Sequence, residues 1–424
     1  MNQTKKVSSN NFGAIGWYYI LLTTVLFMLC SGLTTDTLNV TVGAFSNARG
    51  WAGTTLLYYN TIAGYFSIAA AALIGWLVAK KGTRIIMTTL TAISGIATIA
   101  WGYVNSPMQY LVACAVVISC LNGYAHLCGS NLAAVWFPTR KGLFLGWSTM
   151  GIQLSAVLVL PAMNLLLNKL GIESAYMVFG VAQIALAVLI WFTVRNTPEE
   201  LGKYPDNIPM TAEEAAEYRK QNEEEKSSLS IGQIIKCRQT WLVAIPFGIL
   251  YMTAVGVMSQ LIPRLMTFGF EMNEALTIMS IASLIGVAGS YIYGWIDVKF
   301  GVKKASVLIM LDFIAAIFLM VIPFHIVTMW ISMVLVGAGL GGVANLSASL
   351  TASIFGPRDF AKAFAVINPI MSIIRVLATS VVAFGLTNLG GYSGAYAVFL
   401  VLCVVAFVIT LFVSDKPIQA KHTN

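Results

Sequence analysis

Apolar residues follow one another along most of this chain in long uninterrupted runs, and short polar segments separate the runs. A helix needs about 20 apolar residues to cross a bilayer, whereas a membrane-spanning strand alternates between apolar and polar positions. The runs therefore predict an all-α membrane protein with twelve transmembrane helices. The expected helices cover residues 16–42, 53–79, 84–105, 108–136, 143–168, 175–194, 240–267, 274–297, 303–324, 327–354, 362–388 and 392–414.

The longest polar interruption, residues 195–239, separates the first six predicted helices from the last six. Its stretch MTAEEAAEYRKQNEEEKSS predicts a short charged surface helix with Thr211 as the N-cap. We therefore expect an N-terminal half over residues 1–194, a cytoplasmic linker over 195–239 and a C-terminal half over 240–424. A solvated connector is one interpretation of the linker, and a regulatory or docking segment is the other.

Two pairs of motifs repeat at the same distance along the chain. GWLVAKKGTR begins at Gly75 and GWIDVKFGVK at Gly294, while FPTRKGLF and GPRDFAKAF contain Pro138 and Pro357. Both separations are 219 residues, and the motifs follow the second and the fourth predicted helix of each half. An equal offset in two independent pairs indicates an internal repeat, which predicts two pseudo-symmetric six-helix halves related by an axis along the membrane normal.

Composition agrees with a membrane protein, and the distribution of charge predicts its orientation. Hydrophobic residues make up 58% of the chain and charged residues only 10%, against about 25% charged in soluble proteins. Outside the linker, fourteen of eighteen Lys and Arg residues fall on the side of the termini; Arg49, Lys169 and Arg264 fall on the other side, and Arg375 lies inside a predicted helix. This bias predicts cytoplasmic termini, and it accounts for the net charge of +8 without a nucleic-acid partner.

The twelve predicted helices and the repeated loop together resemble the major facilitator superfamily over the whole chain. In that family the loop usually reads Gly-x-Leu-x-Asp-Arg-x-Gly-Arg-Lys and helps to close the inward side. Ala79 stands in place of the aspartate in the first copy, and Asp297 comes one residue early in the second. The resemblance implies that the two loops act as conformational latches, through Gly75, Lys80, Gly82, Arg84, Gly294, Asp297 and Gly301.

Within that superfamily, WFPTRKGLFLGWSTMGIQLSAVLVLP (136–161) and SIFGPRDFAKAF are similar to the oxalate:formate antiporter family and its monocarboxylate-transporter relatives. The resemblance implies that an organic anion is bound by basic residues of the eighth and eleventh helices. Here Ser290 stands about where the first base is expected, and Arg375 lies about one turn from the second position, near Met371. A single cation favours a monocarboxylate over a dianion such as oxalate.

Ionisable residues inside predicted helices are functional candidates, because a charge is costly at membrane depth. Arg375 follows Lys362 by thirteen residues, or roughly 20 Å of helix, and its repeat mate is Ala156. We expect Arg375 to contact the substrate anion; the alternative is a permanent salt bridge to Asp36 or another acid. Asp312, in the ninth predicted helix, is interpreted as structural, with Ser290 or Tyr293 as its partner.

Other polar residues at similar depth form a second group of candidates. Asp36 is a candidate for proton coupling or gating, and a solvated hydrogen-bonding residue near the mouth is the alternative. His126 and its repeat mate Asn345 are expected as hydrogen-bond donors across the cavity, and His126 also as a proton relay; neutral helix packing is the alternative. Aromatic and amide side chains that could shape the substrate site, or only pack, include Tyr124, Tyr251 and Gln153.

These features favour transport over catalysis. No ATP-binding loop or nucleophile–base pairing stands out, and the six cysteines lack metal-site spacing, so we expect no enzyme, metal or cofactor. The prediction is a monomeric secondary active transporter in the inner (cell) membrane. It would carry a small organic anion, a monocarboxylate, by alternating access as a proton symporter or an anion exchanger. The alternatives are a proton-coupled exporter of cationic or amphipathic compounds and a membrane sensor that binds a ligand without moving it.

Overall fold

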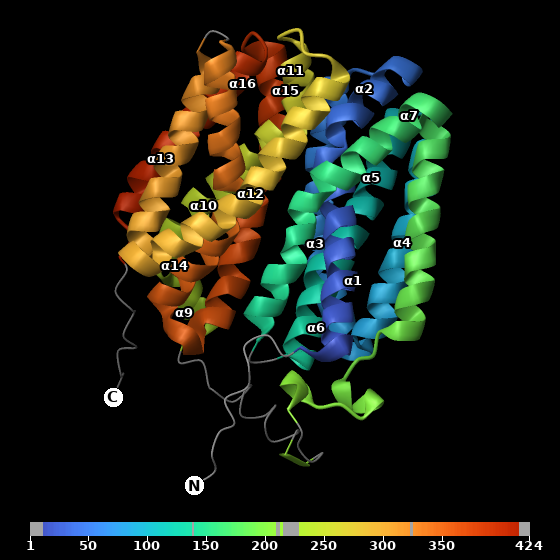
Figure 1. Ribbon diagram of the computed structural model, residues 1–424, viewed down its shortest axis with the longest axis vertical. Helices are drawn as coiled ribbons and strands as arrows, with labels where there is room; N and C mark the ends of the chain where they lie inside the picture. Colours follow the sequence, from blue (N-terminus) through green and yellow to red (C-terminus); the bar gives the residue numbers. More distant parts are fainter. Residues whose placement is uncertain (1–11, 138–139, 209–212, 215–228, 323–324, 415–424) are drawn as a thin grey trace. The chain divides into compact units, whose positions relative to one another are not determined.

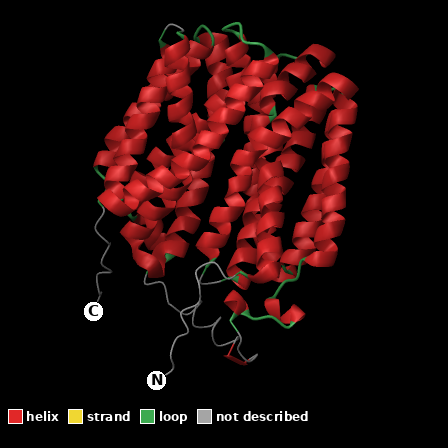
Figure 2. Ribbon diagram, in the orientation of Figure 1, coloured by secondary structure: helices red, strands yellow, loops and turns green. Residues whose placement is uncertain are grey.

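The computed structural model of the chain describes residues 12–137, 140–208, 213–214, 229–322 and 325–414. Within these ranges all regular structure is helical (Figures 1 and 2). The helices of six residues or more are α1 (Gly13–Ser31), α2 (Leu38–Arg49), α3 (Gly53–Lys81), α4 (Thr83–Gly102), α5 (Pro107–Asn122), α6 (Gly129–Trp136), α7 (Lys141–Thr193), α9 (Ile231–Lys236), α10 (Arg238–Ser259), α11 (Leu261–Met266), α12 (Met272–Phe300), α13 (Val302–Val321), α14 (Ile326–Arg375), α15 (Ala378–Asn388) and α16 (Tyr392–Leu411), with the π-helical η2 (Gly123–Cys128).

Eleven helical stretches of the described chain are long and apolar enough to cross a membrane. One of them, Leu143–Thr193, is 51 residues long and contains two predicted helices. Gly171 divides it with a φ of 79°, and Gly356 divides α14 in the same way with a φ of 71°. Glycine adopts such left-handed conformations without the steric penalty of a Cβ atom. The described helices are therefore consistent with the twelve predicted.

Four of the predicted helices are interrupted rather than continuous, and the one expected over 108–136 contains the π-helical turn η2. The helix expected over 16–42 changes into a π-helical turn at Gly32–Asp36, η1, before α2 begins. The helix expected over 240–267 breaks at Gln260, whose φ is −131°, and the one over 362–388 is interrupted between Arg375 and Ala378. The hydropathy of a segment sets its length in the membrane but not where its backbone hydrogen bonds change register.

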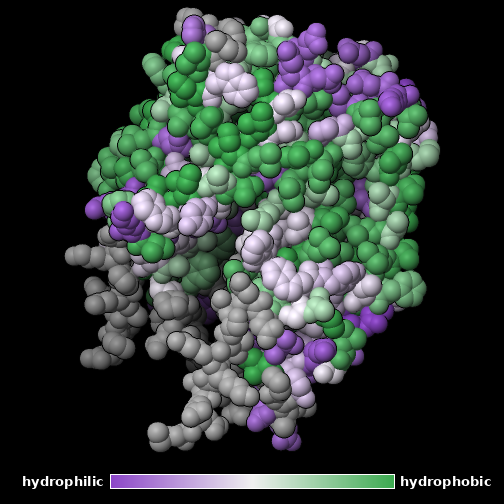
Figure 3. Space-filling view, viewed as in Figure 1, coloured by the Kyte–Doolittle hydropathy of each residue, from purple (hydrophilic) through white to green (hydrophobic). Residues whose placement is uncertain are grey.

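The surface of the described helices is largely hydrophobic, as expected for contact with lipid (Figure 3). Large apolar side chains are exposed on several helices, including Phe66, Phe192 and Val298, the last with 90% of its surface exposed. In a soluble protein such an apolar surface would favour association with other proteins, whereas in a bilayer it faces the apolar lipid chains.

The chain forms two compact units. The first comprises Met1–Leu33, Ala69–Ser155 and Leu166–Glu225, and the second comprises Thr34–Ile68, Ala156–Leu165 and Lys226–Asn424. The division into halves at residues 1–194 and 240–424 stays a prediction.

Close helix contacts in the first unit depend on small residues. A Cβ atom added at Gly95 of α4 would lie 2.7 Å from the carbonyl oxygen of Gly180 in α7. Beside this contact, Gln183 is fully buried; its side chain accepts a hydrogen bond from Ser94 at 2.6 Å and donates one to Thr98 at 3.0 Å. Helices in lipid gain little from the hydrophobic effect when they associate. Close backbone packing and hydrogen bonds of this kind stabilise their association instead.

The second unit shows the same packing between α12 and α14. A Cβ atom added at Gly341 would lie 1.8 Å from the carbonyl oxygen of Gly286, and one at Gly289 would lie 2.2 Å from that of Ala338. The α3 helix approaches the interruption after α14 equally closely, because a Cβ atom at Gly64 would lie 2.6 Å from the side chain of Val376. These glycines allow close packing of the helices on which the candidate site residues lie.

The described start of the linker is packed against the first unit. Pro198, Pro205 and Asp206 are buried, and the Arg140 guanidinium lies 3.5 Å from the Asp206 carboxylate while also donating to the Asp206 carbonyl oxygen. This part of the linker is thus packed at Asp206, whose partner lies 66 residues earlier, and exposed at residues 200–203. The connector and docking interpretations of the whole linker stay predictions. Most of the predicted surface helix, including Thr211, lies outside the described residues.

Candidate functional site

Three of the four ionisable residues that the sequence singles out inside predicted helices lie at interruptions of those helices, and the fourth, Asp312, lies within the continuous α13. Asp36 ends the π-helical turn η1, His126 lies in the π-helical turn η2, and Arg375 is the last residue of α14. A π-helical turn widens the backbone hydrogen-bond spacing and is frequent at functional sites. Each of these side chains therefore lies where its helix departs from regular geometry.

Arg375 is half-buried and makes no ion pair with any described residue. The alternative left by the sequence, a permanent salt bridge to Asp36 or another acid, is therefore not formed with any acid of the described part of the chain. Its identified neighbour is Tyr251 of α10, which interacts with the guanidinium electrostatically. The Tyr251 hydroxyl is in turn hydrogen-bonded to Ser347 of α14. The structure thus brings together a guanidinium and a tyrosine hydroxyl, both predicted as substrate contacts, and adds Ser347.

The backbone around Arg375 is held by its neighbours on two sides. A Cβ atom at Gly248 of α10 would lie 2.8 Å from the side chain of Ile374, so α10 packs directly against this turn. From α3, the Tyr65 hydroxyl donates to the carbonyl oxygen of Ile373 at 3.3 Å. The carbonyl of Ser372 accepts from Val376 at 3.1 Å, which preserves one helical hydrogen bond at the interruption. These contacts therefore fix the position of the backbone from which the Arg375 side chain extends.

Asn345 and Ser290 form a hydrogen-bonded pair between α14 and α12. The Asn345 side-chain nitrogen donates to the Ser290 hydroxyl at 2.6 Å and to its carbonyl oxygen at 3.3 Å. Asn345 is exposed, so the pair is accessible. Ser290 is the position where the resemblance implies a base, and a neutral hydroxyl with its own proton still available lies there instead.

Asp36 is buried, with 5% of its surface exposed, which is not consistent with a solvated residue near the mouth. Its carbonyl oxygen accepts a hydrogen bond from Asn39, also buried, at 2.8 Å. The same Asn39 nitrogen donates to the Met258 carbonyl at 2.7 Å, and its oxygen accepts from the Ile262 amide at 2.9 Å. One side chain thus joins the η1 turn to the break between α10 and α11.

Sequence reasoning missed Asn39, although one signal was present. Asn39 and Met258 are separated by 219 residues, the repeat offset, so the residue contacts its own repeat mate. A short amide side chain close to the end of an apolar run is otherwise unremarkable, and its importance follows only from the break that it faces.

In the first unit, η2 places Tyr124 and His126 in different surroundings. Tyr124 is fully buried, and its hydroxyl has no hydrogen-bond partner among the described residues; Cys30 and Cys120 lie nearby. This enclosure favours the packing interpretation of Tyr124. His126 is half-buried, and its ring meets Phe27 edge-on at 4.9 Å. Gln153, on α7 of the same unit, is also half-buried. The pairing of His126 with Asn345 stays a prediction.

The first predicted latch loop is bound within its own unit. Gly82 has a φ of 85°, and a Cβ atom there would lie 2.7 Å from the Asn196 side chain. That side chain accepts from the Arg84 amide at 2.9 Å, while the Arg84 guanidinium donates to Trp191 and stacks over its ring. Lys80 lies over Trp76, and Gly75 has open space beside it.

The second predicted latch loop repeats part of this arrangement. Gly301 has a φ of 89°, and Gly294 has open space beside it. Asp297 accepts a hydrogen bond from Ser349 of α14, so the early aspartate has a partner inside its own unit. Asp312 interacts with Tyr293, one of the two expected structural partners. The latch role of both loops stays a prediction.

Residues 24–379 match the family model of the Major Facilitator Superfamily. The chain is 21% identical to the oxalate:formate antiporter of Oxalobacter formigenes over 428 residues, covering 98% of this chain and 96% of that protein. It is 25% identical over 222 residues to a protein described as probable anion transporter 4, chloroplastic, of Arabidopsis thaliana, covering 49% of this chain but only 40% of that relative. A probable sulfoacetate transporter of Cupriavidus necator is 21% identical over 225 residues, covering 52% and 50%.

Solved structures share the fold at low sequence identity. The E. coli xylose transporter XylE, in a partially occluded inward open conformation, matches with a TM-score of 0.75 at 15% identity, covering 95% of this chain and 98% of that one. A bacterial homologue of the human lysosomal transporter Spinster matches with a TM-score of 0.71 at 16% identity, covering 96% and 99%.

Proposed function

The chain belongs to the Major Facilitator Superfamily, and on this premise we propose that it is a secondary active transporter of a small organic anion. The substrate class that we favour is a monocarboxylate, carried by alternating access. Transport is driven either by the gradient of a co-transported proton or by the gradient of an exchanged counter-anion.

The observation that carries this proposal is the membrane-embedded Arg375 without an acidic partner among the described residues. An arginine at the centre of a bilayer costs at least about 2.5–3.5 kcal/mol, and the guanidinium does not lose its proton. A carboxylate that enters from solvent would offset this cost and accept two parallel hydrogen bonds from the planar guanidinium. An anionic substrate would therefore account for a charge that has no acidic partner in the described part of the chain.

Neutral hydrogen-bonding groups in the second unit support a singly charged substrate. Tyr251 interacts with Arg375, and the accessible Asn345–Ser290 pair belongs to the same unit. One cation with neutral donors matches one carboxylate and a polar substituent, whereas a dianion would leave a second charge without a partner. The similar proteins, an oxalate:formate antiporter and two probable transporters of anions, agree with the broader class.

Asp36 and His126 are the residues that we propose for coupling. Both lie in π-helical turns, and His126 belongs to the only side-chain type that ordinarily titrates near neutral pH. In a proton symporter, neutralising one of them should remove the effect of a pH gradient on uptake. In an anion exchanger, uptake should instead depend on anion loaded inside the vesicle.

Uptake of labelled formate, acetate and lactate into proteoliposomes tests the proposal, with and without a pH gradient or internal anion. We expect Arg375→Gln to lower kcat/KM for the best substrate by about 10- to 100-fold, the range for a lost charge-assisted hydrogen bond. Arg375→Lys should retain part of the activity because it keeps the charge. Lys362→Gln, an exposed cation on the same helix, is the matched control.

Unchanged carboxylate uptake in Arg375→Gln would overturn the assignment of this side chain. Flux of organic cations alone would point to an exporter, and carboxylate binding without flux would point to a sensor.

A further inference from the structure

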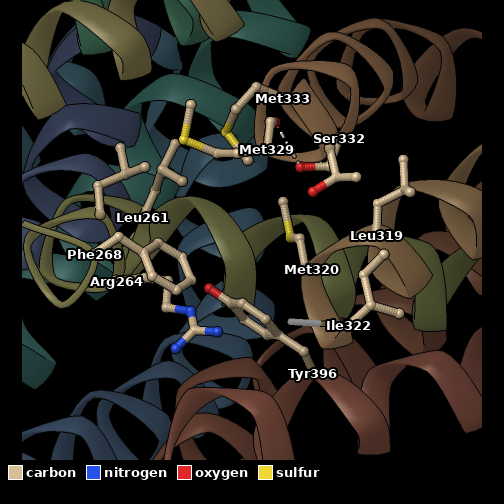
Figure 4. Close-up of a pocket in the computed structure, with 12 residues that line it drawn as sticks. Leu261, Arg264, Phe268, Leu319, Met320, Ile322, Met329, Ser332, Met333 and Tyr396 are labelled. Atoms are coloured by element: carbon tan, nitrogen blue, oxygen red, sulfur yellow. Dashed lines mark hydrogen bonds between the residues drawn. The ribbon is translucent and has the colours of Figure 1, made fainter. Parts of the chain in front are cut away.

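A small cavity lies in the second unit, away from Arg375, between α11, α13, α14 and α16 (Figure 4). Its volume is about 30 Å³, and its lining is mostly apolar, with Leu261, Met320 and Met329 among the side chains. Four residues with hydrogen-bond donors also line it. The hydroxyls of Thr328 and Ser332 donate to backbone carbonyls of α14 or its N-cap, which leaves Arg264 of α11 and Tyr396 of α16 as the donors of interest. In the sequence, Arg264 stands out only as one of three basic residues on the side opposite the termini.

Neither Arg264 nor Tyr396 pairs with a carboxylate among the described residues. Tyr396 is 1% exposed, and its hydroxyl has no hydrogen-bond partner among the described residues. The half-buried Arg264 donates to the Ser393 hydroxyl at 3.1 Å but forms no ion pair with a described carboxylate. In Figure 4 the Tyr396 ring extends from α16 into this region, with its hydroxyl directed toward Phe268.

Aromatic rings surround the guanidinium without neutralising it. The centre of the Phe268 ring lies 4.2 Å from the Arg264 guanidinium carbon, and the Tyr392 and Tyr396 rings lie at 5.7 and 5.9 Å. Cation–π contacts stabilise a guanidinium but leave its full positive charge in place. A water molecule could satisfy the Tyr396 hydroxyl, whereas only an anion would also balance Arg264.

The size of the cavity restricts the anion. A cavity needs about 10–15 Å³ to hold one water, so 30 Å³ accommodates a single small ion but not a carboxylate with its carbon chain. The apolar walls favour a weakly hydrated, singly charged ion. We propose that this cavity binds chloride through Arg264 and Tyr396.

Such an ion would join α11 to α16 beside the break in the seventh predicted helix. Tyr392, one turn before Tyr396, donates a hydrogen bond at 3.3 Å to Gln260, the residue at that break. Bound chloride would therefore stabilise the arrangement of α10, α11 and α16. This role does not depend on what Arg375 binds.

Thermal unfolding of the purified full-length protein in chloride or in gluconate, at equal ionic strength, tests the site. It is measured in the wild type and in Arg375→Gln, because gluconate is a monocarboxylate of the class proposed to bind at Arg375. A ligand that binds only the folded protein raises its melting temperature, and we expect chloride to raise it by about 2–4 °C, with bromide equivalent. Arg264→Gln and the conservative Tyr396→Phe should each abolish the difference between chloride and gluconate. Lys169→Gln, an exposed cation outside the cavity, should retain it.

Arg375→Gln should also retain the chloride effect, so failure of the transport proposal and failure of this one are distinguishable. Equal melting temperatures in chloride and gluconate would overturn the site, as would a full chloride effect in both Arg264→Gln and Tyr396→Phe. A crystal soaked in bromide should show an anomalous peak between Arg264 and Tyr396, and a peak only elsewhere would contradict the proposal.

Discussion

At the scale of single residues, Tyr251 and Tyr124 show how two similar candidates acquire opposite surroundings. Both are tyrosines at similar depth in predicted helices. Tyr251 is hydrogen-bonded to Ser347 beside Arg375, whereas the buried Tyr124 hydroxyl has no described partner. Hydropathy does not distinguish them, because the difference depends on which neighbours other helices supply.

The pair allows a matched test of the site. We expect Tyr251→Phe to raise KM for the transported anion by about 3- to 10-fold, because one hydrogen bond at the Arg375 site contributes about 0.5–1.5 kcal/mol. Tyr124→Phe should leave uptake unchanged and stability equal or slightly higher, since an unsatisfied buried hydroxyl is removed. Uptake kinetics and thermal unfolding of both variants check this, and equal effects of the two changes would contradict it.

At the scale of helices, the important feature is the break between α10 and α11. Breaking a helix leaves amide and carbonyl groups without their usual partners, and buried groups of this kind are costly. Asn39 satisfies the Met258 carbonyl and the Ile262 amide with one side chain. The interruption is therefore stable in this structure because a residue far away in the sequence supplies the missing hydrogen bonds.

Replacing Asn39 by alanine should leave these backbone groups unpaired. We expect the free energy of unfolding to fall by about 2–4 kcal/mol, from two or more buried hydrogen bonds without replacement. Asn388→Ala, which removes an exposed amide bonded within its own helix, should cost much less. Thermal unfolding of both variants gives the comparison; a change no larger at Asn39 than at Asn388 would exclude this role.

At the scale of the whole molecule, the linker is anchored by its first residues. Arg140 and Asp206 are an ion pair with side chains 12% and 1% exposed. Removing one partner of a buried pair leaves the other charge uncompensated, which costs about 3–5 kcal/mol. The packed start of the linker thus depends on a contact between a helix-connecting loop and a distant segment.

Loss of that contact should expose the segment to proteolysis. In Arg140→Gln we expect trypsin to cleave after Lys203 at least ~10-fold faster, because local opening determines protease access. Glu200→Gln, an exposed acid in the same segment, is the control and should be cleaved at the wild-type rate. Mass spectrometry of timed digests measures the rates, and equal cleavage of both variants would show that the pair does not anchor the linker.

The membrane class, the positions of the helices and the internal repeat could all be predicted from the sequence by itself. Bilayer thickness sets the length of an apolar run, so this information is local and one-dimensional. Arg375, Asp36 and His126 could be singled out for the same reason, since an ionisable residue in an apolar run is conspicuous.

Only the tertiary structure decided what each of these residues meets. Arg375 has no acid beside it among the described residues. The hydrogen bonds of Asn39 across the helix break, and the cavity lined by Arg264 and Tyr396, each bring together residues that are far apart in the chain. Hydropathy records how favourably one segment leaves water, whereas pairing depends on which side chains the packing of other helices brings within hydrogen-bonding distance.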